Sequence, residues 1–385
     1  MKILIVSSLP FSYSCGVRTH LQHLCQALTT LHIDHDLINT NESKALNRLR
    51  SFRTGVDFNS IGLFNVWAQS QKIQLLRHSI RKKLSDGRFD IIHAHDVYAA
   101  YAAWLEVQKR IPVLFTMHGP LAYEMLAVGE KKNSLRMQKL KKYERVAYSN
   151  ATACIAVDSE QKRILVDDYH VLESKVQVVY NAVDIDSILS LVREPYTGQM
   201  PDRFFLIPRR LVPKNGVEYA IRASALTQNK FDLLIAGAGP QRTYLEELAE
   251  RNGPGRNVRF LGDQSPDHLL PLMKKALGVI VPSVAVSGVI EATSLAVLEA
   301  MALRRPLIAS KIGGIWEILR SEENAFLTVP GDAAAIANAM DAVLALDKAE
   351  LERRTQRNFE ILMQHHSLPV WRQKMLDIYT RLYHH

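Results

Sequence analysis

Short apolar segments alternate with segments of helical periodicity along almost the whole chain. The first such pair is KILIVSS (2–8) followed by VRTHLQHLCQALTTL (17–31), where Leu21, Leu24 and Leu28 repeat at helical spacing. Near-continuous apolar strands separated by helices are typical of parallel sheets that are covered on both faces. The sequence therefore predicts an α/β protein built from doubly wound parallel sheets.

The alternation runs twice, once in each half of the chain. Further strands of the first half are expected at FDIIHAHD (89–96), PVLFTMHG (112–119), ATACIAVDS (151–159) and KVQVVYNAVD (175–184). Those of the second half are expected at FFLIPRRL (204–211), FDLLIAGAGP (231–240), NVRFLGD (257–263), ALGVIVPS (276–283) and RPLIASKIGG (305–314). Two separate sheets are therefore predicted.

The stretch LVREPYTGQMPDRF (191–204) separates the two series. Its apolar periodicity breaks at Pro195, Gly198 and Pro201, which indicates a linker. A chain of 385 residues is also longer than one ordinary domain. Two domains with a cleft between them are the expected organisation.

We place the domain boundary after residue 193. The first domain is predicted over residues 1–193 and the second over 194–368. The tail PVWRQKMLDIYTRLYHH (369–385) has helical spacing and is expected to pack back on the first domain.

Composition narrows the class of protein. A hydrophobic content of 47% with 23% charged residues is ordinary for a globular enzyme, and the longest apolar runs are shorter than the ~20 residues that a membrane span needs. Three cysteines without a C-x-x-C pair argue against a disulfide framework or a zinc site and for a reducing compartment. A cytoplasmic location is therefore expected.

The formal net charge of +9 is moderately basic. Basic residues gather in RHSIRKK (77–83) and EKKNSLRMQKLKKYER (130–145). These segments either form solvated helix faces or contact an anionic substrate or membrane surface, which would place the protein peripherally at the inner face of a membrane. Nucleic acid is not an expected partner, because the basic runs contain few aromatic residues and match no known module.

The stretch EATSLAVLEAMA carries two carboxylates at the ends of an otherwise apolar segment. A helix is predicted to begin near Leu295, with Thr293 and Ser294 as suitable N-cap residues. The backbone amides of such a helix start bind anions, and a diphosphate is a natural ligand. Glu299, one turn inside the helix, is then placed to accept hydrogen bonds from ribose hydroxyls, and Glu291 to reach a sugar beyond the diphosphate. The alternative is a capping role for one glutamate and a surface position for the other.

Two further segments offer groups for a phosphate. PRRLVPKNG (208–216) follows a predicted strand and contains Arg209, Arg210 and Lys214, whose charges suit a leaving diphosphate. Gly16 lies in a strand-to-helix loop where the backbone can approach a phosphate closely. Surface salt bridges are the alternative for the three cations.

Histidines occur at the ends of two predicted strands. His93 and His95 lie toward the end of one predicted strand and His118 toward the end of the next. A histidine at such a position is often a structural residue with satisfied hydrogen bonds. His118 is the best functional candidate because a Gly-Pro pair follows it, and His95 with Asp96 is a candidate for the acceptor side of a site.

Taken in order, these motifs resemble the retaining glycosyltransferases of family 4, which have the GT-B fold. The matching pieces cover nearly the whole chain: the Gly16 loop, FDIIHAHD, FTMHGP, YNAVD, RRLVPKNGVEYAI, AGAGP, VRFLG, VPS, EATSLAVLEAMA and GGIWEIL. The resemblance implies two Rossmann-like domains facing a cleft, with the acceptor on the first and a nucleotide sugar on the second.

The resemblance also assigns roles to residues. Glu291 and Glu299 correspond to the family's pair of glutamates, the first meeting the donor sugar and the second the ribose. Arg210 and a lysine would hold the diphosphate, and His118 would lie near the anomeric centre of the donor sugar.

Three positions depart from the family pattern. The lysine that usually precedes glycine after the Arg-Leu motif is Asn215 here, and Lys214 lies one position earlier. The usual Gly-Gly of the first loop is Cys15-Gly16, and the usual Glu-Gly-Phe-Gly at Glu291 is Glu-Ala-Thr-Ser. These differences leave the diphosphate contact of Lys214 open.

The expected activity is transfer of a hexose-type sugar with retained anomeric configuration. A UDP-sugar is the favoured donor and GDP-mannose the next, and the acceptor is a glycan, a glycolipid or a small molecule in cell-envelope or glycoconjugate biosynthesis. No covalent nucleophile stands out, so the resemblance implies attack on the face from which the diphosphate leaves. No Asp-x-Asp motif lies in a suitable loop, so neither an obligatory metal nor another cofactor is expected.

Three other functions remain open. A nucleotide-sugar epimerase or hydrolase would use the same fold without an acceptor. A non-catalytic sugar-nucleotide-binding subunit is supported only by Asn215 and the altered Glu-Ala-Thr-Ser loop. A dehydrogenase fits poorly, because GAGPQR (237–242) ends in arginine where the dinucleotide fingerprint needs glycine.

Overall fold

The computed structural model describes residues 1–9, 16–39, 62–127, 129–193, 200–252, 257–321 and 323–384. Cys15 and the linker residues Pro195 and Gly198 lie outside these ranges, and so do the predictions made for them. The chain forms two compact units, one of Met1–Tyr180 with Arg372–His385 and the other of Asn181–Trp371.

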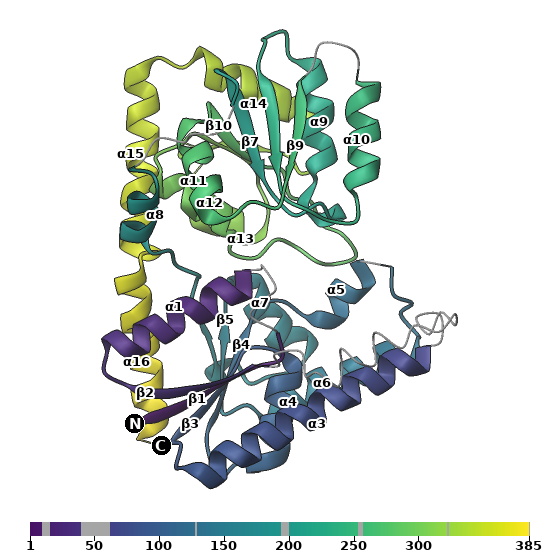
Figure 1. Cartoon of the computed structure of the whole chain (residues 1–385), viewed down its shortest axis with the longest axis vertical. Helices are drawn as coiled ribbons and strands as arrows, with labels where there is room; N and C mark the ends of the chain where they lie inside the picture. Colours follow the sequence, from purple (N-terminus) through teal and green to yellow (C-terminus); the bar gives the residue numbers. More distant parts are fainter. Residues whose placement is uncertain are drawn as a thin grey trace. The chain divides into compact units, whose positions relative to one another are not determined.

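The first unit contains a six-stranded parallel sheet in the order β2-β1-β3-β4-β5-β6 (Figure 1). Its strands are β1 (Lys2–Ser7), β2 (Asp34–Asn39), β3 (Ile91–Ala94), β4 (Val113–Met117), β5 (Ala153–Ala156) and β6 (Val176–Val178). Its α-helices are α1 (Gly16–Thr30), α3 (Gly62–Asp86), α4 (Val97–Val107), α5 (Leu121–Ala127), α6 (Leu135–Asn150) and α7 (Ser159–Arg163), with a π-helical turn at Ile164–Asp168 and a 3-10 turn at Glu173–Lys175. The strand order reverses between β1 and β3, which defines the switch point of this sheet.

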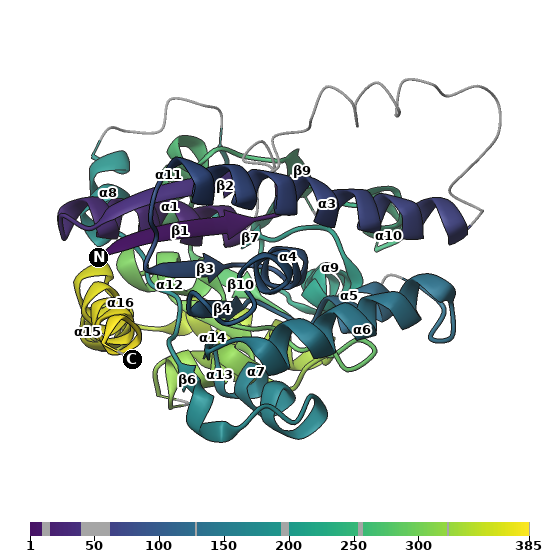
Figure 2. The ribbon, with the colours of Figure 1, turned by 90° about the horizontal axis from the view of Figure 1, so that it is seen from below.

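Helices α3, α4 and α6 pack together beside this sheet (Figure 2). Their contact is apolar: α4 is rich in alanine, and Ala99, Ala102 and Ala103 are completely buried in the core. Small side chains on α4 allow the neighbouring helices to approach it closely.

The second unit contains another six-stranded parallel sheet, in the order β12-β11-β10-β7-β8-β9. Its strands are β7 (Phe204–Pro208), β8 (Asp232–Ala236), β9 (Val258–Gly262), β10 (Gly278–Val281), β11 (Leu307–Ser310) and β12 (Phe326–Thr328). Its helices are α8 (Ile185–Leu191), α9 (Val217–Leu226), α10 (Arg242–Arg251), α11 (Pro266–Lys275), α12 (Leu295–Ala302), α13 (Gly313–Leu319), α14 (Ala333–Ala345) and α15 (Lys348–His365), with a 3-10 turn at Pro213–Asn215. This is the Rossmann strand order, and its switch point lies between β7 and β10.

Alternate residues of β7 enter two different cores. Phe205 and Ile207 pack with α9, α10 and α14, whereas Phe204 and Leu206 pack with α11, α12 and α13 on the opposite face. Because successive strand residues point to opposite faces, a strand buried on both sides must be apolar throughout. This explains why FFLIP carries no polar alternation.

The division between the units lies before α8, whereas the sequence placed it after residue 193. Helix α8 and the residues just before it belong to the second unit, because Val183 and Ile188 are buried in the core beneath α11 and α12. Val183 also pairs with Ser367. Of the YNAVD segment, Tyr180 ends the first unit and residues 181–184 begin the second.

The final helix, α16 (Leu368–Tyr383), contributes its residues from Arg372 onward to the first unit. The Tyr379 hydroxyl is hydrogen-bonded to His93 Nδ1 at 2.6 Å, and both side chains are completely buried. His93 Nε2 contacts Thr116 Oγ1 at 2.7 Å. His93 is therefore a structural residue that ties β3 to α16. None of the described helices combines the length and the apolar character of a membrane-spanning segment.

We predict that Tyr379→Phe lowers the free energy of unfolding by about 1–3 kcal/mol, because a buried imidazole nitrogen loses its partner. Tyr383→Phe is the matched control, since Tyr383 is 48% exposed. Urea denaturation of both variants measures the effect. Equal midpoints for the two variants would contradict this role of the hydroxyl.

Candidate active site

The switch point of the second sheet brings together the ends of β7 and β10. Arg209 follows β7 directly, and its guanidinium Nη2 donates to Ser283 Oγ, just beyond β10, at 3.0 Å. Nη2 also donates to Asn215 Oδ1 at 2.5 Å. Ligands of open α/β sheets bind at such strand ends, so this cation lies where a site is expected.

Glu291 forms a two-point ion pair with this guanidinium. Its Oε1 lies 3.0 Å from Nη1 of Arg209 and its Oε2 lies 2.8 Å from Nη2. The two side chains are only 8% and 13% exposed. Burial alone would raise the pKa of Glu291, but the charge and hydrogen bonds of Arg209, with a smaller effect of Lys214, hold it below its ordinary value. Glu291 is therefore ionised at neutral pH.

Helix α12 begins beside this pair. Ser294 is its N-cap residue, yet the Ser294 side chain makes no capping hydrogen bond and instead accepts one from Arg209 Nη1 at 3.2 Å. Ser294 and the neighbouring Thr293 are buried, and Leu295 is the first helical residue, as the sequence predicts. The side chain of Ser294 thus does not cap the first turn of α12, and the backbone amides of this turn suit an anion.

The loop before α12 is held by α13. The amide of Gly314 donates to the carbonyl of Glu291 at 3.0 Å, and a Cβ at Gly314 would come within 2.6 Å of the carbonyl carbon of Ala292. Only glycine allows this approach. The Asn181 side chain also contacts the Thr293 carbonyl, at 3.5 Å. The GGIWEIL and YNAVD motifs therefore position the loop that carries Glu291.

Glu299 lies one turn into α12, on the same side as Leu295. It retains a little exposed surface, but the protein surrounds its carboxylate, and this burial raises its pKa to about 7. No hydrogen bond to this carboxylate is found among the described residues. Hydroxyl donors of a ligand would supply the hydrogen bonds that a buried carboxylate needs.

Arg210 and Lys214 are placed differently from Arg209. Arg210 is exposed, and its carbonyl accepts a hydrogen bond from Asn215 Nδ2 at 2.8 Å. Lys214 is half-buried and its carbonyl accepts from the amide of Val284 at 2.9 Å. The guanidinium that reaches Glu291 thus belongs to Arg209, whereas the family resemblance had singled out Arg210. The diphosphate contacts of Arg210 and Lys214 stay predictions.

In the first unit, Asp96 organises the switch point between β1 and β3. One carboxylate oxygen accepts from the amides of Tyr98 and Ala99 at 3.1 and 3.0 Å, which caps α4. The other accepts from the Ser8 amide at 2.5 Å and the Ser7 hydroxyl at 3.2 Å. Asp96 therefore fixes the turn that presents His95, and a direct contact with an acceptor stays a prediction. Gly16 begins α1 and is exposed.

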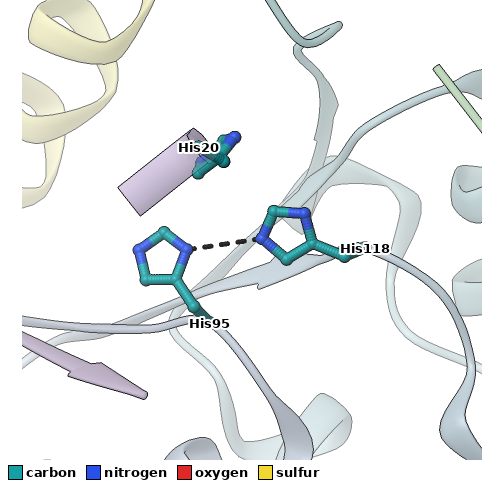
Figure 3. Close-up of side chains that lie close together, drawn as sticks. All are labelled: His20, His95 and His118. Atoms are coloured by element: carbon teal, nitrogen blue, oxygen red, sulfur yellow. Dashed lines mark hydrogen bonds between the residues drawn. The ribbon is translucent and has the colours of Figure 1, made fainter. Parts of the chain in front are cut away.

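Three histidines from separate segments gather at this edge of the sheet (Figure 3). His95 Nδ1 and His118 Nε2 face each other at 3.5 Å, and the ring of His20 on α1 lies edge-on to His118 at 4.7 Å between centroids. Burial, with the neighbouring histidines adding to it, holds the pKa values of His95 and His118 well below the ordinary range. Both rings are therefore neutral at pH 7. The sequence did not single out His20.

The nitrogens of this cluster all lie within 4.8 Å of one another, and the pair from His95 and His118 is 3.5 Å apart. Ligands of tetrahedral zinc are about 3.4 Å apart at a metal–nitrogen distance of about 2.1 Å. Neutral imidazoles in this arrangement are also suited to hydrogen bonds with hydroxyl groups.

The raised pKa of Glu299 predicts a pH-dependent stability. The unfolded chain loses this proton near the ordinary value of 4.5 but the folded protein only near 7, so unfolding releases a proton in this window and stability falls as pH rises. Glu299→Gln removes the buried charge and should stabilise the protein at pH 8 by up to about 3 kcal/mol, with little effect at pH 5. Thermal melts of this variant and of the exposed control Glu250→Gln measure it; a pH-independent difference would contradict the buried charge.

Comparison with known proteins places this site in a family. Residues 15–187 match the model described as Glycosyltransferase Family 4, and residues 192–360 match the model described as Glycosyl transferases group 1. A glycosyltransferase of Methanocaldococcus jannaschii is 31% identical over 271 residues, which are 67% of each chain. Glycogen synthase of Mycobacterium tuberculosis is 26% identical over 92% of this chain and 89% of its own.

Solved structures agree on the fold. Sucrose-phosphate synthase from Thermosynechococcus elongatus has a TM-score of 0.78 at 18% identity, with 99% of each chain covered. The HepE protein of Anabaena, determined in complex with UDP-glucose, has a TM-score of 0.69 at 18% identity over 99% of this chain and all of its own. The chain is therefore a glycosyltransferase of family 4 with the GT-B fold.

Proposed function

We propose that the protein is a retaining hexosyltransferase that takes its sugar from a nucleoside diphosphate sugar, with a UDP-sugar favoured over GDP-mannose. The observation that carries this proposal is the pair of largely buried glutamates on either side of the start of α12, where Ser294 provides no side-chain cap. Glu291 is held ionised beside Arg209, and the carboxylate of Glu299 is surrounded by protein without a hydrogen-bond partner among the described residues. An anion site flanked by two carboxylates suits a diphosphate joined to two sugar rings.

The donor is proposed to lie along the start of α12. The backbone amides at the start of α12, around Thr293, Ser294 and Leu295, would bind the diphosphate. Glu299 would accept hydrogen bonds from the ribose hydroxyls, and Glu291 would contact the transferred sugar. The Anabaena relative, determined with UDP and with UDP-glucose, supports a nucleotide-sugar donor. Gly16 is proposed to approach the donor from the first unit through its backbone.

The proposed reaction exchanges one bond at the anomeric carbon for another. The bond from that carbon to the diphosphate oxygen breaks, a bond to the acceptor hydroxyl oxygen forms on the same face, and the acceptor proton passes to the departing diphosphate. Arg210, Lys214 and the start of α12 would stabilise the charge that develops on the diphosphate. His118 would lie near the anomeric centre and donate hydrogen bonds to donor hydroxyls. We propose that neither an obligatory metal nor another cofactor takes part.

The acceptor is proposed to be a glycan, a lipid-linked saccharide or a small molecule of cell-envelope or glycoconjugate biosynthesis. His95 and Asp96 would lie on its side of the site. Helix α6 and the turn before it expose Lys131, Lys132 and Lys142, which supports contact with an anionic membrane. Cys25 and Cys154 are free thiols, in keeping with a cytoplasmic protein at or near the inner face of that membrane.

Nucleotide binding is predicted to stabilise the protein selectively. UDP or GDP at 100 times its dissociation constant should add about 2.7 kcal/mol to the unfolding free energy, whereas ADP and NAD should not. Glu299→Ala should weaken the shift by loss of the ribose contact, and the exposed control Glu250→Ala should retain it. Thermal melts with the four ligands measure this. A shift with NAD alone, or equal shifts in both variants, would contradict the assignment.

Product analysis separates this function from its rivals. We expect the protein incubated with UDP-glucose alone to leave the donor almost intact over an hour, as followed by proton NMR, because the acceptor is missing. Rapid appearance of free glucose would indicate a hydrolase, and a second nucleotide sugar would indicate an epimerase. When acceptor is supplied, the transferred sugar should keep the anomeric configuration of the donor.

A further inference from the structure

The guanidinium of Arg209 joins three segments of the second unit. Its two terminal nitrogens donate to the turn after β7, to the residue just beyond the end of β10 and to the loop that leads into α12. The acceptors are Asn215 Oδ1, Ser283 Oγ, the Glu291 carboxylate and Ser294 Oγ. Because the four acceptors come from three segments, the position of the cation is fixed by the fold of this edge of the sheet.

Asn215 has the orientation that a cation in its neighbourhood requires. Its Nδ2 donates to the Arg210 carbonyl at 2.8 Å, so its Oδ1 is the atom that faces Arg209. The side chain is 6% exposed. The following residue, Gly216, has φ of +61° and a Cβ there would lie 1.9 Å from the Pro282 carbonyl oxygen. The turn cannot shift easily, so the amide oxygen is held against the guanidinium.

A lysine at position 215 would conflict with this arrangement. Its ammonium would replace the amide oxygen beside a second buried cation, and two like charges at that separation repel strongly in a weakly polar interior. The sequence has asparagine at the position where the family resemblance leads one to expect lysine. The positive charge at position 209 and the neutral acceptor at position 215 are therefore chemically complementary.

We propose that Arg209 is the positioning residue of the donor site: it fixes the carboxylate of Glu291 toward the transferred sugar, and it supplies from position 209 the buried positive charge that would otherwise come from position 215. The contact between Glu291 and the sugar rests on the proposed function; the pairing of Arg209 with Asn215 and Glu291 does not.

The geometry leaves Glu291 able to bind hydroxyls. Each carboxylate oxygen has two lone-pair directions, and the hydrogen bond from Nη1 uses one of those on Oε1. Oε2 lies 2.8 Å from Nη2, whose two N–H groups donate to Asn215 and Ser283. Among the described residues, at least one direction on each oxygen therefore remains for a sugar hydroxyl. The Nε–H of Arg209 is also buried, and it has no acceptor among the described residues, so the guanidinium keeps one donor for a ligand oxygen.

The first test follows the ionisation of Glu291 in the protein alone. With glutamate labelled by carbon-13 at the carboxyl group, and Glu291→Gln used for assignment, the wild-type signal should not titrate between pH 5 and 8. In Arg209→Gln the burial remains while the charge is lost, so the signal should titrate within this range. Arg210→Gln, at the exposed neighbouring arginine, should behave as the wild type. An Arg209→Gln signal that stays ionised throughout would overturn the proposal.

The second test exchanges the charge between the two positions. UDP-glucose affinity is measured by calorimetry for Asn215→Lys, Arg209→Ala and the double variant, with UDP as a second probe. Each single variant should lose about tenfold or more in UDP-glucose affinity and less in UDP affinity, because Glu291 contacts the sugar. The double variant should recover to within about threefold of the wild type, since one cation is again present without a like-charged neighbour.

The outcomes distinguish a failure of the proposed function from a failure of the Arg209 proposal. If the affinity losses of the two single variants multiply in the double variant, the exchange of charge between positions 209 and 215 is overturned. If the wild type binds neither UDP nor UDP-glucose, the proposed function fails. The stability of the same three variants is then compared by their urea denaturation midpoints. Recovery of the midpoint in the double variant supports the pairing of Arg209 with Asn215, and additive losses of stability overturn it. If a single variant does not fold, recovery of folding in the double variant supports the proposal, and failure of both contradicts it.

Discussion

The buried ion pair between Arg209 and Glu291 is the interaction on which the second unit's site depends. A charge removed from water is costly unless an opposite charge and hydrogen bonds compensate it. Here one guanidinium pairs with a carboxylate and also donates to Ser283, Ser294 and Asn215. Removal of either charge would leave the other buried and unpaired. The contacts that hold the turn after β7, the residue beyond β10 and the loop before α12 together therefore also determine the geometry of the site.

The two sheets use their switch points in different ways. At the second, between β7 and β10, the groups are charged and lie beside an uncapped helix start. At the first, between β1 and β3, Asp96 is used to cap α4, and neutral imidazoles of His95 and His118 are presented instead. Charged groups suit an anionic diphosphate, and neutral donors and acceptors suit hydroxyl groups. The same strand topology thus provides two different chemical surfaces.

Much of the fold follows from local sequence patterns. KILIVSS forms β1 and FFLIP forms β7 because a strand buried on both faces must be apolar throughout, and α12 begins at Leu295 as the Thr-Ser pair indicates. The strand β2 (Asp34–Asn39) was not predicted, because its DHDLIN sequence is largely polar, whereas apolar runs marked the predicted strands. It lies at the edge of its sheet. The membership of α8 in the second unit depends on long-range packing of Ile188 that no local signal reports.

The candidate site could be predicted only in part for the same reason. The glutamates stand out because they interrupt an apolar segment. Arg209 and Arg210 are adjacent and chemically identical, and the choice between them is made by Ser283 and Glu291, which lie 74 and 82 positions away in the chain. His20 likewise joins His95 and His118 only through the fold. Family membership supplied the order of the motifs, whereas the contacts of Asn215 required the structure.

The most direct test of this account is a crystal structure of the protein with UDP. The account predicts the diphosphate at the amides that begin α12 and the ribose hydroxyls within hydrogen-bond distance of the Glu299 carboxylate. UDP bound elsewhere, or a ribose that makes no contact with Glu299, would contradict it.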